Sequence, residues 1–138
     1  MTVSATPTKT VSICGAILIL IGSTAQALPI WPHQQAEAFA TCSGRFSALA
    51  THLQSHRKPG AKENLELKAE FDLMLEAVLP YALEEGVTLP EQRRWRSAGW
   101  GQIAALLADV SYGLDQSQIE RATNALEFHI QDCRDLLL

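Results

Sequence analysis

Apolar residues recur at intervals of three and four along most of this chain, and this spacing constrains its fold more than any other feature. Between His33 and His56 they form one stripe, at Phe39, Cys42, Phe46, Leu49 and Leu53. This spacing places apolar side chains on one face of a helix, whereas a half-buried strand alternates with a period of two. We therefore predict an amphipathic helix over residues 33–56, ended by the run RKPG at residues 57–60.

A second helix is predicted over residues 61–79, where the stripe continues through Leu67, Phe71, Met74 and Val78. Pro80 follows, and proline lacks the amide hydrogen that an internal helical position donates. The helix is therefore predicted either to end at Pro80 or to bend there and continue to Glu85. Gly86 is a favourable C-terminal cap, because glycine adopts the left-handed conformation without strain.

Two start signals mark the remaining helices. Thr88 and Glu91 have the spacing of a capping box, which predicts a third helix running to about residue 111. Asp115 is a favourable N-cap residue and predicts a fourth helix that runs to the end of the chain. Because the connections are short and strand-like alternation is absent, we predict an all-α fold, an antiparallel four-helix bundle with an irregularity at Pro80.

The N-terminal segment has the pattern of a secretory signal peptide over residues 1–27. Lys9 precedes the uncharged run VSICGAILILIG, and Ala25 and Ala27 supply the small side chains that signal peptidase requires. We predict cleavage after Ala27, a single helical domain over residues 28–138, and a secreted, periplasmic protein. The alternative is an uncleaved anchor, which a run of 12 residues disfavours because a membrane-spanning helix needs about 20.

Removal of this segment would leave two cysteines, Cys42 and Cys133, in an oxidising compartment. Each lies on the apolar stripe of a terminal helix, near ends that an antiparallel pairing brings level. We therefore predict one disulfide between the first and last helices. Closing a loop of about 90 residues would stabilise the fold by about 4–5 kcal/mol in the chain-entropy model. Two free thiols or an intermolecular bond are the alternatives.

Composition and motifs exclude several functions. The net charge of −4 argues against a nucleic-acid partner, and 47% hydrophobic residues argue against a disordered acidic chain. The sequence contains no G-x-S-x-G, P-loop, dinucleotide-binding or C-x-x-C-H motif. We therefore predict no catalytic residue and no cofactor.

One cluster resembles a binding site. Arg93, Arg94, Trp95 and Arg96 combine positive charge with an aromatic ring near a helix N-terminus, which favours an anion or a protein partner. The alternative places Trp95 in the core and the arginines in solvent. The arrangement in space decides between these two readings.

His52 and His56 are spaced so that both side chains lie on one face of a helix. Zinc sites use three or four ligands, so two histidines are weak candidates, and we predict no metal site. His129 is the natural third ligand. However, if Cys42 is level with Cys133, His129 lies nearly two helical turns away from the pair.

The segment TCSGRFSA at residues 41–48 resembles the C-x-G-R-[FYL]-S-A segment of a group of small secreted bacterial helical proteins. Those proteins also tend to have a second cysteine near the C-terminus, as Cys133 is here. The resemblance implies no activity, but it directs attention to two structural residues. Gly44 would permit close approach of a neighbouring helix, and Arg45 would reach an acidic residue on it; the alternative leaves Arg45 in solvent.

These observations favour a secreted, non-catalytic helical protein that acts on another protein or on a component of the cell envelope. The alternative is a carrier of a small ligand or metal, using the bundle interior or the pair His52 and His56. No nucleic acid is expected as a partner, and no membrane span is expected after cleavage.

Overall fold

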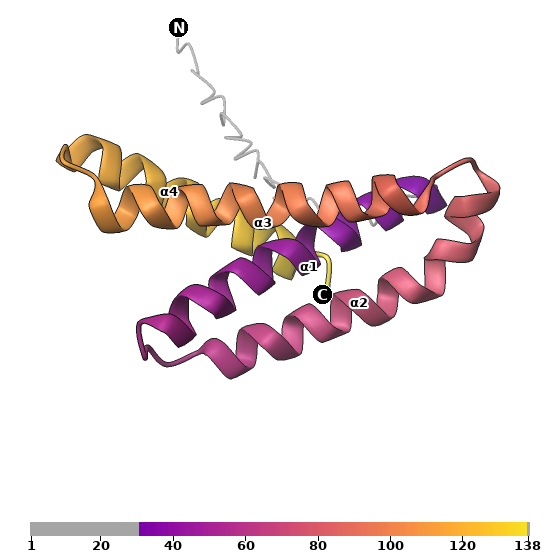
Figure 1. Ribbon diagram of the computed structural model, residues 1–138, viewed down its shortest axis with the longest axis horizontal. Coiled ribbons are helices and arrows are strands. Elements are labelled where there is room, and N and C mark those ends of the chain that lie inside the picture. Colours follow the sequence, from indigo (N-terminus) through magenta and orange to yellow (C-terminus); the bar gives the residue numbers. More distant parts are fainter. Residues whose placement is uncertain (1–30, 138) are drawn as a thin grey trace, which may run out of the picture.

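A computed structural model describes residues 31–137, which form four helices and no strand (Figure 1). The helices are α1 (Pro32–Ser55), α2 (Ala61–Glu84), α3 (Leu89–Tyr112) and α4 (Gln116–Asp135). The predicted all-α, four-helix fold is confirmed. The predicted signal peptide lies outside the described residues.

The two predicted N-caps are present. Glu91 donates its backbone N–H to Thr88 Oγ1 at 3.3 Å, and the Thr88 backbone N–H is 3.0 Å from the Glu91 carboxylate. Asp115 accepts a hydrogen bond from the backbone N–H of Ser117 at 3.2 Å. Each bond satisfies a backbone donor that the first turn of a helix leaves without an intrahelical partner.

Helix α2 continues through Pro80 to Glu84, so the second of the two predicted outcomes is the observed one. The last turns of α2 bend toward the start of α3 in Figure 1, as expected where proline removes an internal hydrogen bond. Gly86 then adopts a left-handed φ of 97°. The Val87 N–H closes the helix by donating to the Ala82 carbonyl at 3.0 Å.

Helix α1 occupies the centre of the molecule. Helices α2 and α3 both pack against it, whereas α4 packs mainly against α3 and has only a small contact with α1. In a square bundle, α1 would instead have α2 and α4 as its lengthwise neighbours. This difference follows from the close approach of α1 and α3 that two glycines permit, as described below.

The core lies between α1 and its two neighbours. Phe46 and Phe71 are fully buried, and their rings stack with centroids 5.7 Å apart. Phe39 packs against Phe71 at 6.2 Å, and α3 contributes the buried side chain of Ile103. The stripe predicted for the first helix is therefore its core-facing side.

The predicted disulfide joins Cys42 of α1 to Cys133 of α4, with Cα atoms 5.6 Å apart. Both side chains are buried. The bond attaches the C-terminal end of α4 to α1, so the register predicted from the two cysteines is confirmed.

Candidate functional site

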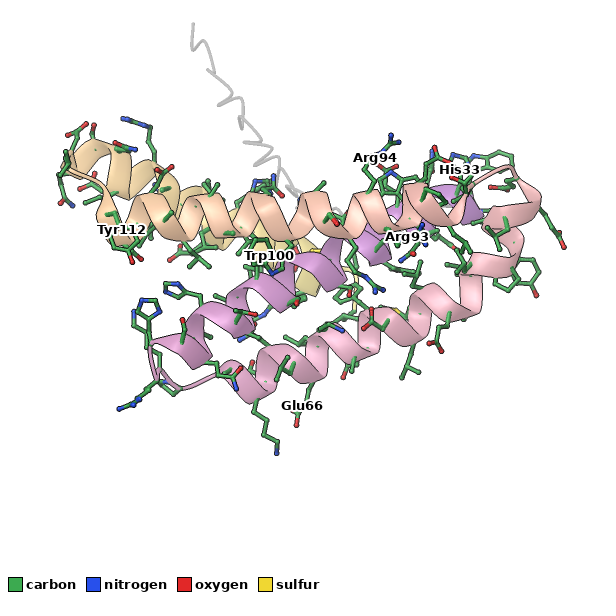
Figure 2. All side chains as sticks on the ribbon, viewed as in Figure 1. His33, Glu66, Arg93, Arg94, Trp100 and Tyr112 are labelled. Atoms are coloured by element: carbon green, nitrogen blue, oxygen red, sulfur yellow. A yellow bond between two sulfur atoms is a disulfide. The ribbon has the colours of Figure 1, made fainter. Side chains whose placement is uncertain are left out.

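The four residues of the predicted basic patch do not share one surface. Trp95 is half-buried against the core, and Arg96 forms an ion pair with Asp72 of α2 at 2.7 Å. Arg93 and Arg94 are exposed on α3 (Figure 2). The structure therefore leaves two arginines on the surface and assigns the other two residues to packing between helices.

The segment Cys42–Arg45 touches every other helix, and we call it the hub segment. Cys42 bonds to α4, and Ser43 donates a hydrogen bond to α2. Gly44 lies against the α3 backbone, and Arg45 bonds to both α3 and α4. Four consecutive residues reach three different helices because successive residues on a helix are rotated by about 100°. This segment is the one that carries the resemblance to secreted bacterial helical proteins.

Two glycines set the distance between α1 and α3. A Cβ atom placed on Gly44 would lie 2.0 Å from the Arg96 carbonyl oxygen, and one on Gly99 would lie 2.2 Å from the Thr41 carbonyl oxygen. Both obstacles are backbone, which cannot swing away as a side chain can. The helices therefore cross at a separation that only glycine allows on both sides.

Asp72 of α2 joins three helices through its carboxylate. It accepts hydrogen bonds from Ser43 at 2.6 Å and Arg96 at 2.7 Å, and Lys68 lies one turn earlier at 2.5 Å. Partial burial alone would raise the pKa of Asp72. The hydrogen bonds from Lys68 and Ser43, together with the charges of Arg96 and Lys68, outweigh burial and hold the pKa below its ordinary value.

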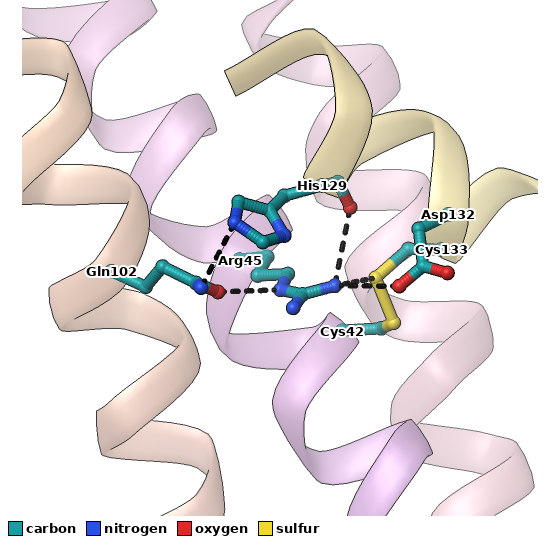
Figure 3. Close-up of polar contacts among 6 residues, drawn as sticks. All are labelled: Cys42, Arg45, Gln102, His129, Asp132 and Cys133. Atoms are coloured by element: carbon teal, nitrogen blue, oxygen red, sulfur yellow. Dashed lines mark hydrogen bonds and ion pairs between the residues drawn. A yellow bond between two sulfur atoms is a disulfide. The ribbon is translucent and has the colours of Figure 1, made fainter. Parts of the chain in front are cut away.

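Arg45 makes the corresponding connection between α1, α3 and α4 (Figure 3). Its Nε donates to Gln102 Oε1 at 3.0 Å, and its Nη1 donates to the His129 carbonyl at 3.2 Å. The same nitrogen lies 3.1 Å from Asp132 Oδ2 and 3.4 Å from Cys133 Sγ. With 11% of its side chain exposed, Arg45 is not a solvent-facing residue.

His129 completes this network. Gln102 Nε2 lies 3.0 Å from His129 Nε2, and an amide nitrogen can only donate, so the neutral ring carries its proton on Nδ1. Burial lowers the pKa of His129, and the charge of Arg45 lowers it further, against a smaller opposing effect of Asp132. His129 is therefore a packing residue of α4, and its contacts with Arg45 and Gln102 keep it away from the pair on α1, as the cysteine register predicts.

An open groove of about 700 Å³ lies between α1 and α4. Its buried or half-buried walls are Leu49, Leu126 and Ile130, so the groove is mainly apolar. Phe128 lines it and remains 66% exposed. The sequence signal for this surface is weak: Phe128 is an aromatic residue that lies off the face of α4 that carries Leu126, Ile130 and Cys133.

A second, smaller hollow of about 220 Å³ opens between the C-terminal halves of α1 and α3, and we call it the wedge. His52 and His56 line it from α1. Trp100 and Tyr112 line it from α3, near the middle and the end of that helix in Figure 2. The wedge remains open because α3 presents small residues, including Ala104 and Ala108, opposite α1.

Comparison of the chain with protein-family models, curated proteins and solved structures finds no match. Among residues 31–137, no helix has both the length and the hydrophobicity required to cross a membrane. In the same part of the chain, no three histidine, cysteine, aspartate or glutamate side chains gather as metal ligands. The groove and the wedge each place exposed aromatic side chains beside an apolar lining, Phe128 in the groove and Trp100 and Tyr112 in the wedge.

Proposed function

We propose that this chain is an exported, non-catalytic interaction module that binds a helical segment of another protein in the groove between α1 and α4. The observation that carries the proposal is the groove itself, a mainly apolar hollow of about 700 Å³ beside the exposed ring of Phe128. Exposed apolar surface of this kind is typical of protein-binding sites.

The dimensions and polarity of the groove favour an amphipathic helix as the occupant. Its lining on α4 extends from Asn124 to Arg134, a distance of about 15 Å, which is nearly three helical turns. A bound helix with apolar residues at positions i, i+4 and i+7 would cover this length. Polar side chains at the margins, including Glu127 and Gln131, would fix its direction along the groove.

Export is the second part of the proposal. A disulfide between Cys42 and Cys133 is stable in an oxidising compartment such as the periplasm. The sequence has the pattern of a signal peptide ending at Ala27. Sequencing of the protein isolated from its native compartment should give Leu28 as the first residue, whereas an intact chain in the membrane fraction would contradict cleavage.

Binding of another protein in the groove can be tested by site-specific photocrosslinking in the native cells. A photoreactive amino acid at position 128 should give one major adduct with another protein, while the same group at position 73 should give none. Leu73 is a matched control because it is also 66% exposed but lies on α2, away from the groove. Equal labelling at both positions, or an adduct with a second copy of the chain alone, would overturn the proposal.

The captured protein then allows a quantitative check. Phe128→Ala should weaken binding of the purified partner by at least about tenfold, because exposed aromatic residues beside a groove commonly dominate binding energy. Leu73→Ala should leave the affinity unchanged. An equal loss in both variants would assign the interaction to another surface.

A further inference from the structure

His52 and His56 form a close pair at the C-terminal end of α1, where both line the wedge. Their ring centroids are 4.2 Å apart, with an angle of 30° between the ring planes. Two imidazoles on adjacent coordination positions of one metal ion, each bound at 2.0–2.1 Å, have ring centres about 4.5 Å apart. The separation in the structure is therefore close to that of two ligands of a single ion.

Hydrogen bonding determines which nitrogen of His56 is free to coordinate. Its Nδ1 is 2.9 Å from the His52 backbone carbonyl oxygen. A carbonyl oxygen can only accept, so Nδ1 of the neutral ring carries the proton and Nε2 carries the lone pair. A ligating histidine usually donates its other ring N–H to such an acceptor, which holds the ring in position.

We propose that His52 and His56 form an exposed two-histidine chelate for a divalent transition-metal ion, with Cu²⁺ as the preferred ion. Neutral imidazoles suit copper, nickel and zinc, and Cu²⁺ binds most tightly in that series. Only two protein ligands are supplied, so water occupies the remaining positions and the ion can exchange. The site lies in the wedge, and the proposal is independent of the groove on the α4 side.

The test uses calorimetric titration of the oxidised, exported chain with CuCl₂, in buffer containing glycine as a weak competing chelator. One equivalent of Cu²⁺ should bind, and His52→Ala and His56→Ala should each lower the affinity by at least about tenfold. His33→Ala is the matched control at the opposite end of α1 and should leave the affinity unchanged. Unchanged affinity in the variant lacking both His52 and His56 would overturn the proposal.

Tryptophan fluorescence provides a second readout that locates the ion. Bound Cu²⁺ should quench the emission of Trp100, which lines the same hollow, so Trp100→Phe should remove most of the quenching. A large excess of Mg²⁺ should not restore the emission, because Mg²⁺ prefers oxygen ligands. Quenching that persists undiminished in Trp100→Phe would place the ion elsewhere and overturn the proposal.

Far-ultraviolet circular dichroism checks that each variant folds. His56 is exposed and His52 is half-buried, so neither substitution removes a core side chain. His56→Gln provides a variant that keeps a polar side chain but offers no imidazole. It should fold like the parent chain and lose the same affinity as His56→Ala; parental affinity in the folded His56→Gln variant would overturn the proposal.

Discussion

The two halves of α1 have the same type of sequence but different surroundings. In residues 32–46, the closed half, the large side chains of Phe39 and Phe46 are buried. In residues 47–55, the open half, Leu49 and Leu53 are only half-buried, and the groove and the wedge flank this part of the helix. Apolar periodicity alone does not distinguish these two environments.

The difference arises at the crossing of α1 and α3. Helices in close contact at Gly44 and Gly99 diverge away from that point unless large side chains fill the space. Toward the N-terminal end of α3, Trp95 packs against the core. Toward its C-terminal end, Ala104 and Ala108 do not fill the space, and the wedge remains. The closed half therefore supplies stability, and the open half supplies the surfaces available for binding.

The strongest test of this comparison replaces one phenylalanine in the closed half and one beside the open half. Phe46→Ala removes a fully buried ring and should lower the free energy of unfolding by about 3–5 kcal/mol. Phe128→Ala, beside the open half, should change it by less than about 0.5 kcal/mol because the ring is already 66% exposed. Urea denaturation measures both values, and similar losses would show that the groove is part of the stabilising core.

Breaking the disulfide should have the next largest effect. Reduction, or Cys42→Ser, should lower the free energy of unfolding by about 3–4 kcal/mol, the middle of the range for removal of a native disulfide and somewhat below the chain-entropy value for this loop of 91 residues. Cys133→Ser and the double variant should lose the same amount, since each removes the same bond. Amide exchange in the reduced protein should increase mainly in α4. An equal increase in α2 would contradict the conclusion that the disulfide attaches α4 to α1.

Gly44→Ala tests the crossing directly. The new methyl group would meet the Arg96 carbonyl, so we expect a loss of at least about 2 kcal/mol. Gly101→Ala is the matched control on α3: no heavy atom lies within 4 Å of the new methyl group, and the protein should gain about 0.5–1 kcal/mol. If Gly44→Ala left the free energy of unfolding unchanged, the backbones of α1 and α3 would not be in the close contact that requires glycine.

The smallest expected effect is the acid sensitivity of Asp72 on α2, which accepts a hydrogen bond from Ser43 of the closed half. The pKa of Asp72 is lowered on folding, so the unfolded chain binds a proton more readily than the folded one. The stabilisation is present above the ordinary pKa of 3.8 and is lost as the pH falls through the lower folded value. Asp72→Asn should therefore be less stable than the parent at pH 7, and this difference should shrink below about pH 4.

Glu66→Gln is the control for that titration. Its side chain is 62% exposed, and it forms an ion pair with Lys62 on the same helix. The substitution should leave the free energy of unfolding nearly unchanged at both pH values. A pH-dependent difference as large as that of Asp72→Asn would attribute the effect to general charge and not to the network around Asp72.

Local interactions explain which features could be predicted from the sequence. The capping box at Thr88, the N-cap at Asp115 and the glycine cap at Gly86 each depend on residues a few positions apart. The apolar stripes follow from helical geometry, and the disulfide follows from two cysteines on the stripes of the terminal helices. The contacts of Arg45 were only partly predictable, because a helix position gives the direction of a side chain but not its partner.

The sequence by itself therefore determined four helices, the capped starts of α3 and α4, the core face of α1 and the pairing of the cysteines. Only the tertiary structure decided that α1 is central, that α3 crosses it at Gly44, and that Asp72 and Arg45 each join three helices through polar contacts. It also decided where the groove and the wedge lie. The physical reason is that helical periodicity specifies which face is apolar, whereas the choice of neighbour depends on the fit of distant side chains and backbone surfaces.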